Sequence, residues 1–240
     1  MATGNNPGGA PLQPAYILHR RNYGNSSLLL ECFTPAGGRF PAIARGASAR
    51  FSKGASMPQP FQPFWLKLAG RGEVRTLAAC EAAAGPAPLQ GERLYCAFYL
   101  NELLLRLLPR DDPHALLFDR YAQTLTELSD GVAADLLRRF EVALLQALGY
   151  GAPLHLEASG GRPVMAEARY HYHLEEGPIR NEPPAGAEVS GATLLALAGE
   201  RPFDDLCRRE ARALMRRLID HYLGGRPLKS RELFRQPGRG

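Results

Sequence analysis

The pattern of apolar residues changes abruptly between residues 81 and 91, and this change constrains the fold more than any other feature. Before it, from Tyr16 to Ala79, short strand-like segments alternate with glycine-containing turns. After it, apolar residues recur at the spacing of α-helices. The stretch between is rich in alanine, glycine and proline, which is typical of a linker. We therefore expect a small β-domain followed by an α-helical one.

The first part is expected to be a barrel of five strands. Residues at Thr34–Gly38 and Gly70–Gly72 have the composition of hairpin turns. Five strands in so short a stretch fit a closed barrel, for which the OB-fold is the usual solution, although an SH3-like barrel fits the same pattern. The predicted strands are Tyr16–Arg20, Leu28–Phe33, Phe40–Arg45, Phe61–Leu68 and Val74–Ala79.

The second part is expected to be α-helical. Asp112 and Pro113 have the composition of a helix cap and first turn. Residues 151–191 are rich in glycine, proline and glutamate without a regular pattern, which predicts an irregular acidic insertion. The predicted helices are Arg93–Leu108, Asp112–Leu128, Val132–Leu148 and Phe203–Leu223. The predicted organisation is a flexible arm at 1–14, an OB-fold domain at 15–80, and a helical domain at 89–236 that ends in a basic tail.

The basic residues are concentrated at the two ends of the chain. Residues 1–80 carry nine lysines and arginines and only two acidic residues, and residues 201–240 carry eleven against five. Residues 81–200 carry nine against seventeen. A polyanion would be attracted by the ends and repelled by the middle, so the distribution favours nucleic acid at particular surfaces. A basic composition alone would not distinguish this function, because many basic proteins bind no polyanion.

The sequence gives no sign of membrane insertion or secretion. No apolar run approaches the roughly 20 residues of a membrane-spanning helix, and the start lacks the cationic and apolar regions of a secretion signal. The cysteines lack paired spacing and stand in apolar or helical contexts, which predicts buried, reduced thiols in the cytoplasm. They are Cys32, Cys80, Cys96 and Cys207.

Motifs of enzymes are absent as well. The segment Gly224–Ser230 ends in Lys-Ser but lacks the glycine that precedes the lysine of a phosphate-binding loop. No nucleophile elbow, zinc-protease motif or dinucleotide fingerprint occurs. The basic first part has too few acidic residues to hold the metal ions of a nuclease. We therefore expect a binding protein without a catalytic centre or a cofactor.

A series of short motifs in a fixed order resembles the RecO family of DNA repair proteins. No motif is specific alone, but together they extend over nearly all of Tyr16–Gln236. The resemblance implies an α+β chain with an N-terminal OB-fold barrel and an α-helical domain. It also implies a nucleoid-associated protein that binds single- and double-stranded DNA, anneals complementary strands, and interacts with RecR and single-stranded-DNA-binding protein (SSB). The motifs are Gly37-Gly38-Arg39, Ala44–Ala47, Gln59-Pro60-Phe61, Gly70–Val74, Tyr99–Leu104, Leu137–Glu141, Leu148–Gly151 and Leu223–Phe234.

One departure from the family concerns zinc. Many RecO proteins carry a four-cysteine zinc site after the third helix, whereas residues 151–206 contain no cysteine. The candidate ligands that remain are His155, His171 and His173, and the last two would share one face of a strand. Without a thiolate or a positioned carboxylate this is a poor zinc site, so we expect a zinc-free member of the family.

The barrel is expected to bind DNA through its cations, because annealing requires a protein that neutralises the phosphates of two strands. The Ser/Gly-rich segment 46–58 is expected to be a flexible rim loop, and OB-folds bind single strands with such loops and with aromatic platforms. Trp65 is a candidate platform, although it could instead seal the barrel against the helical domain. The expected DNA-binding residues are Arg39, Arg45, Arg50, Lys53, Trp65, Lys67, Arg71 and Arg75.

A second basic surface is expected at the C-terminal end. Three arginines recur every four residues and would form one ridge on the last long helix, unless Asp205 and Glu210 neutralise it. Beyond Gly224-Gly225 the basic residues face only Glu232. The expected DNA contacts here are Arg208, Arg212, Arg216, Arg226, Lys229 and Arg231.

A third site is expected for a protein partner. SSB carries an acidic C-terminal tail that ends in an apolar residue with a free carboxylate, and such a tail fits an apolar slot with a cation at its rim. The resemblance places this groove at the third helix, where we assign Leu137, Arg138 and Arg139 to it. Ordinary salt bridges of surface arginines would explain the same residues.

Two other functions fit the sequence. The chain could be an adaptor that binds SSB or RecR and touches DNA only incidentally, or an RNA-binding OB protein. Annealing of complementary oligonucleotides across a salt series separates these alternatives, because an adaptor accelerates annealing little and a mediator does so with strong salt sensitivity.

Overall fold

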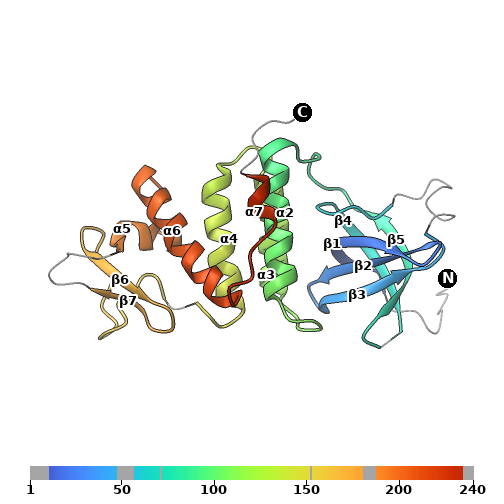
Figure 1. The fold of residues 1–240 in the computed structure, drawn as a ribbon, viewed down its shortest axis with the longest axis horizontal. Helices are drawn as coiled ribbons and strands as arrows, with labels where there is room; N and C mark the ends of the chain where they lie inside the picture. Colours follow the sequence, from blue (N-terminus) through green and yellow to red (C-terminus); the bar gives the residue numbers. More distant parts are fainter. Residues whose placement is uncertain (1–10, 48–56, 71, 152, 181–187, 235–240) are drawn as a thin grey trace, which may run out of the picture. The chain divides into compact units, whose positions relative to one another are not determined.

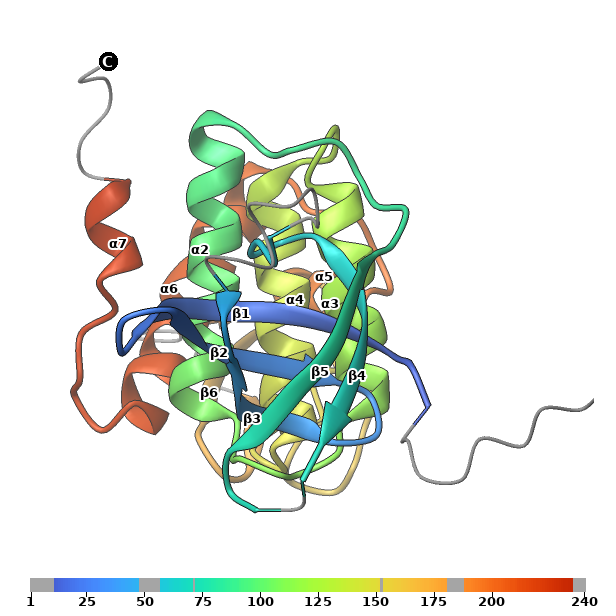
Figure 2. The same cartoon turned by 90° about the vertical axis from the view of Figure 1, so that its right-hand side faces the viewer.

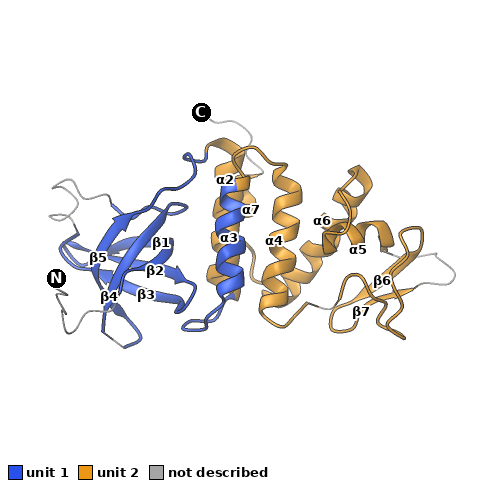
Figure 3. Ribbon diagram, turned by 180° about the vertical axis from the view of Figure 1, so that it is seen from behind, with its two compact units in different colours: residues 1–89, 108–126 blue, residues 90–107, 127–240 orange. Residues whose placement is uncertain are grey.

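A computed structural model describes residues 11–47, 57–70, 72–151, 153–180 and 188–234 (Figure 1). Contacts divide the chain into two compact units (Figure 3). Unit 1 comprises residues 1–89 and 108–126, and unit 2 comprises residues 90–107 and 127–240. Nearly all of helix α3 (Ala115–Glu127) therefore belongs to the N-terminal unit, although α2 (Gly91–Leu107) precedes it in the chain.

Unit 1 contains a closed five-stranded barrel (Figure 2). The strand order is β1-β2-β3-β5-β4, in which β3 and β5 are parallel and the other neighbours antiparallel. This five-stranded barrel confirms the predicted OB-fold and, with the helices that follow, the predicted fold class. Its strands are β1 (Gln13–Tyr23), β2 (Ser27–Thr34), β3 (Gly38–Ala44), β4 (Pro63–Ala69) and β5 (Arg75–Ala82).

The barrel core follows the alternation of strand side chains. In β4, Phe64, Leu66 and Leu68 are buried, and Trp65 between them is 44% exposed. The prediction that β4 begins at Phe61 is wrong. Phe61 has φ +70°, a left-handed conformation that ends strand geometry, and pairing begins two residues later at Pro63.

Helix α3 packs on the outside of the barrel within unit 1. The ring of Tyr16 lies 5.5 Å from Phe118 and 5.0 Å from Tyr121, and Phe33 lies 5.4 Å from Phe118, measured between ring centroids. These aromatic side chains stand on the opposite face of β1 and β2 from the barrel interior, so they give the barrel a second apolar layer.

The predicted start of α3 at Asp112 is also wrong. The helix begins at Ala115, and the Asp112 carboxylate lies 3.0 Å from Nε2 of His114 instead of capping a helix. The Asp112 backbone approaches β3 so closely that a Cβ on Gly38 would lie 2.0 Å from the Asp112 carbonyl oxygen. The contact with β3 therefore involves the same residues that the sequence assigned to the first helical turn, and the helix starts after them.

Unit 2 is built from three long helices, which confirm the predicted ones with shifted ends, and from smaller elements. The smaller elements are two short helices and a three-stranded sheet of order β7-β6-β8. The long helices are α2, α4 (Ala133–Ala147) and α6 (Asp205–Tyr222). The smaller elements are β6 (Arg169–His173), β7 (Gly177–Arg180), β8 (Val189–Ser190), α5 (Gly191–Ala198) and α7 (Ser230–Leu233).

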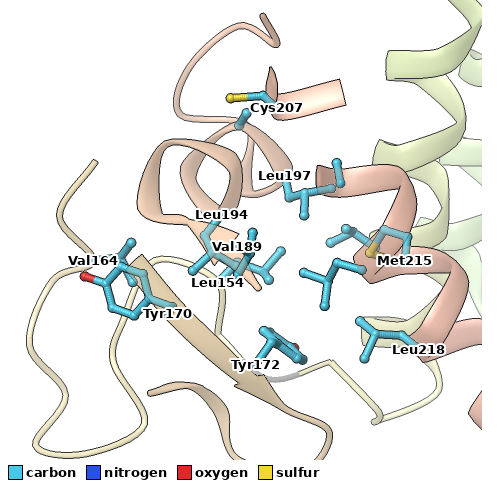
Figure 4. Packing of buried hydrophobic residues seen from close by; sticks show 14 of the residues in the cluster. Leu154, Val164, Tyr170, Tyr172, Val189, Leu194, Leu197, Cys207, Met215 and Leu218 are labelled. Carbon is cyan, nitrogen blue, oxygen red and sulfur yellow. The ribbon is translucent and has the colours of Figure 1, made fainter. Parts of the chain in front are cut away.

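The three strands of unit 2 lie within the stretch that was expected to be irregular. Tyr170 and Tyr172 of β6 are buried in one cluster with Leu194 of α5 and Met215 of α6 (Figure 4). The strands have five, four and two residues, too short to show a clear period in the sequence. The insertion is thus partly regular, and its two tyrosines form part of the hydrophobic core.

Candidate functional site

Two of the predicted DNA-binding arginines are engaged within unit 1. The Arg39 side chain is 13% exposed, its Nη1 lies 3.1 Å from Glu31 Oε2, and its Nε and Nη2 donate to the Leu108 carbonyl at 3.0 and 2.8 Å. Arg75 lies 2.6 Å from Asp111 Oδ1 and stacks 3.6 Å above the ring of Phe40. Both arginines therefore hold residues 108–111 to the barrel, and a carboxylate already neutralises the charge of each.

Other barrel cations are available to a ligand. Arg45 is exposed and Lys67 is half-buried, and neither forms an ion pair within the described parts of the chain. Trp65 is exposed as a platform must be, but Glu81 lies opposite it in the β4–β5 register. Three further predicted residues, Arg50, Lys53 and Arg71, lie outside the described residues, as does most of the predicted rim loop.

The barrel also presents an aromatic and a cation that sequence reasoning missed. Tyr23 is 50% exposed, and Arg21, two residues before it on β1, is exposed without an ion pair among the residues described. Arg21 pairs in register with Leu29 of β2, which pairs with Ile43 of β3. OB-folds bind oligonucleotides with the face of strands 2 and 3 and with the loop between strands 1 and 2, and Arg21 and Tyr23 lie at the end of β1 beside that loop. These two residues were not predicted as DNA contacts, because the first strand was predicted to end at Arg20.

Unit 2 contains a groove of about 620 Å³ between helices α2, α4, α6 and α7. It joins two sets of residues that the sequence assigned to different ligands: the α6 arginines expected to bind DNA, and Leu137 and Arg138 expected to bind the SSB tail. The lining residues are Glu92, Cys96, Tyr99, Ala133, Ala134, Leu137, Arg138, Arg208, Arg209, Arg212, Arg216, Arg231 and Phe234.

Several groove arginines are held by carboxylates. Arg208 contacts Asp135 through Nε and Nη2, at 2.9 and 3.1 Å, and Asp205 through Nη1 at 3.1 Å. The hydrogen bonds to Asp135 raise the pKa of Arg208. Asp220 accepts from Arg231 at 2.5 Å and lies 3.7 Å from Arg216. These pairs fix the guanidinium groups along the rim and reduce their net charge.

The floor of the groove rests on a buried carboxylate. Glu141 is fully buried, and its Oε1 accepts hydrogen bonds from the Tyr99 hydroxyl and from Nη2 of Arg138, both at 2.6 Å. Burial raises the pKa of Glu141, while the charge of Arg138 and the hydrogen bond from Tyr99 oppose the increase. Burial likewise raises the pKa of Tyr99. The network holds two lining side chains, Tyr99 and Arg138, in fixed positions.

Arg139 does not line the groove, although it was assigned to the same site. Its guanidinium lies 5.9 Å from the centroid of the Phe203 ring. Successive residues of a helix point about 100° apart, and Arg139 lies on the side of α4 that faces Phe203 and not on the side that lines the groove. Leu137 and Arg138 are brought together in the lining and Arg139 is directed elsewhere.

The C-terminal segment forms one wall of the groove. The Glu102 carboxylate accepts hydrogen bonds from the backbone N–H groups of Lys229 and Ser230, at 3.0 and 2.8 Å, and from the Ser230 hydroxyl at 2.7 Å. These bonds place α7 beside α2 (Figure 1). The side chains of Arg226 and Lys229 are exposed and form no ion pair among the described residues.

The donor atoms present do not fit a zinc site. No group of three potential ligands is close enough to hold a metal ion in the described portions of the chain. His171 lies 3.8 Å from Glu188 on the exposed side of β6, and His173, on the same face of the strand as predicted, is exposed. The cysteines are free, with Cys32, Cys96 and Cys207 buried and Cys80 half-buried.

None of the helices in the described ranges has the length and apolar composition of a membrane span.

Comparisons with known proteins agree with this architecture. Residues 12–86 match the model of the recombination protein O N terminal domain, and residues 88–232 match that of the C terminal domain. The chain is 49% identical over 233 residues to the DNA repair protein RecO of Alkalilimnicola ehrlichii, covering 95% of this chain and 92% of that protein. It is 47% identical to RecO of Methylococcus capsulatus, covering 93% of each. Since both domain models and these relatives span nearly the whole chain, it belongs to the recombination protein O (RecO) family.

Proposed function

We propose that the chain is a non-catalytic DNA repair protein that binds single- and double-stranded DNA and anneals complementary strands. It works with RecR and is recruited by the C-terminal tail of SSB. Family membership and the names of the relatives, DNA repair protein RecO, support the repair role. The observation that carries DNA binding is the OB barrel, whose β1–β2–β3 side carries the exposed Tyr23 and cations that form no ion pair among the described residues.

The DNA contacts on the barrel are Arg21, Tyr23 and Arg45, with Trp65 and Lys67 on β4. Their cations have no internal carboxylate among the described residues, so they remain available to phosphates. Arg50, Lys53 and Arg71 stay in the proposal from the sequence alone. Arg39 and Arg75 leave it because each is already paired with a carboxylate of unit 1.

In unit 2 we divide the predicted DNA-binding residues between two ligands. Arg226 and Lys229 are exposed and remain proposed DNA contacts, whereas Arg231 is held by Asp220. Arg208, Arg212 and Arg216 line the same groove as Leu137 and Arg138. An apolar floor below a basic rim suits an acidic peptide with an apolar end, which is the chemistry of the SSB tail.

Annealing of complementary oligonucleotides, with and without SSB, tests the proposal. We expect acceleration that weakens steeply as salt increases, because each neutralised phosphate on a single strand contributes about 0.7 to the slope of log affinity against log salt. An adaptor would bring repair proteins to SSB-coated strands without accelerating their annealing. A protein specific for RNA would prefer RNA strands. Either result would refute the proposal.

Two variants locate the DNA surface. Arg21→Gln with Arg45→Gln removes two exposed barrel charges and should lower the salt slope for single strands by about 1.4, twice the value for one phosphate contact. Arg93→Gln is the control, because Arg93 is an exposed arginine of unit 2 outside the groove and without an ion pair in the described chain. Equal slopes in the double variant and the wild type would remove this surface from the proposal.

A further inference from the structure

Among the described residues, six arginines line the groove of unit 2, but they do not carry equal free charge. Arg138, Arg208, Arg216 and Arg231 each have a carboxylate partner, as described above. Arg209 and Arg212 form no ion pair within the parts of the chain that the structure describes, and both are exposed. The uncompensated positive charge of the groove therefore lies on these two residues.

The two arginines are placed to act together. They are three residues apart on α6, so their side chains are neighbours on one face of the helix. Glu92 is the one acidic residue in the lining, and it comes from the first turn of α2. A pair of guanidinium groups on one face, opposed by a single carboxylate, attracts a ligand with more than one negative charge.

The rest of the lining selects among anionic ligands. Leu137, Ala133, Ala134 and Phe234 offer apolar surface beside the two arginines. Nucleic acid is bound through its phosphates and by stacking of bases on aromatic rings, and neither contact uses the aliphatic surface of Leu137, Ala133 and Ala134. A peptide that carries carboxylates and ends in an apolar side chain uses both parts of the lining, so the groove fits a peptide better than DNA.

We propose that Arg209 and Arg212 are the residues that bind the carboxylates of the acidic peptide in this groove. Arg138, fixed by the buried Glu141, shapes the floor and contributes little free charge. This assignment rests on the proposed function, in which the groove binds the SSB tail. It changes the residues responsible, since the sequence assigned the charge recognition to Arg138 and Arg139 and gave Arg212 to DNA.

The test measures binding of a fluorescent peptide with four aspartates and a terminal phenylalanine that has a free carboxylate. The full-length wild type is compared with Arg209→Gln/Arg212→Gln. We expect the double variant to bind about tenfold more weakly, since two exposed charge pairs are lost. We also expect that amidation of the peptide's C-terminus weakens binding to the wild type severalfold but hardly changes binding to the double variant.

A matched control and a blocking variant separate the possible failures. Arg93→Gln removes an exposed charge from the same unit outside the groove lining and should bind the peptide as the wild type does. Ala134→Trp places a bulky ring at an exposed position of the lining and should abolish binding.

If Ala134→Trp binds the peptide normally, the groove is not the peptide site. Binding of the SSB tail in this groove is then removed from the proposed function. If Ala134→Trp blocks binding but Arg209→Gln/Arg212→Gln has wild-type affinity and the same sensitivity to amidation, the assignment to Arg209 and Arg212 is overturned. It is also overturned if the double variant keeps the peptide and loses affinity for an oligonucleotide instead.

Discussion

The carboxylate of Glu102 in α2 accepts two hydrogen bonds from Ser230, 128 residues later in the chain, one from its backbone N–H and one from its hydroxyl. A third bond comes from the Lys229 N–H. Burial raises the pKa of Glu102, but these hydrogen bonds outweigh burial and the pKa is lowered. One side chain thus holds the segment that carries Arg231 and Phe234 into the groove lining.

Glu102→Ala should release this C-terminal segment. The variant leaves the amides of Lys229 and Ser230 without an acceptor, which costs about 1–3 kcal/mol for the local structure and increases exchange of the Ser230 amide about 10–100-fold. Hydrogen exchange followed by mass spectrometry measures this. Glu92→Ala, an exposed residue of the same helix, is the control and should leave the exchange unchanged. Equal protection in both variants would show that the segment is held by other contacts.

Glu210→Ala should destabilise unit 2 as a whole. Oε2 of Glu210 accepts hydrogen bonds from the Ser190 N–H at 2.8 Å and from the hydroxyls of Ser190 and Thr193 at 2.7 Å each, and Arg169 pairs with the other oxygen. Loss of the carboxylate leaves several part-buried donors unpaired, so the free energy of unfolding should fall by about 2–4 kcal/mol. Chemical denaturation measures the change, with the exposed Glu176→Ala as the control.

The effect of Glu210→Ala also depends on pH. Burial raises the pKa of Glu210, but the hydrogen bonds from Thr193 and Ser190 together lower it below its ordinary value of 4.5. A lowered folded-state pKa gives stability that is complete above the ordinary pKa and is lost as the pH falls through the folded value. The difference between wild type and variant should therefore be constant from pH 7 to 5 and shrink below about 4.5. A difference that grows on acidification would contradict this assignment.

The sequence predicted the barrel well because its strands follow a period of two and its turns contain glycine. The burial of Phe64, Leu66 and Leu68 around an exposed Trp65 is visible in the sequence alone. The short strands of unit 2 could not be predicted, since Tyr170 and Tyr172 are buried by helices that are distant in the sequence. Tertiary packing decides such elements, and local propensity does not.

The sequence predicts that the chain has basic surfaces, but it does not predict which of the basic residues are free to bind a ligand. A count of charges identifies basic ends, but it does not show that Arg39 binds the Leu108 carbonyl or that Arg208 binds Asp135, 73 residues away. Nor does it show that α4 and α6 line one groove. Pairing across long sequence separations determines which cations remain free, and no local pattern encodes it.

Cys96 provides a chemical test of burial at the groove. Burial raises the pKa of its thiol to about 11 from an ordinary value of 9.0. Because the thiolate is the nucleophile, alkylation by iodoacetamide at pH 8 should be about 100-fold slower in the folded protein than in denaturant. Peptide mapping by mass spectrometry measures the rate at each cysteine. Rapid labelling of Cys96 in the folded protein would show that the groove floor opens.

Gly38 offers a test of how the 108–112 segment meets the barrel. Two effects oppose a side chain there: φ is +63°, and a Cβ would lie 2.0 Å from the Asp112 carbonyl oxygen. Gly24 separates them, because its φ is +62° but a Cβ there meets nothing within 4 Å. Gly24→Ala should therefore cost about 1 kcal/mol, the usual penalty of a left-handed conformation for alanine.

Gly38→Ala carries the same backbone penalty and must also displace the Asp112 backbone. That displacement disturbs the Arg75–Asp111 pair and the bonds of Arg39 to Leu108, so the total loss should be at least 3 kcal/mol. Thermal and urea denaturation of the two variants measure the difference between them. If both lose the same stability, the backbone conformation alone requires glycine at position 38, and the close approach of residues 108–112 adds nothing to the stability of the barrel.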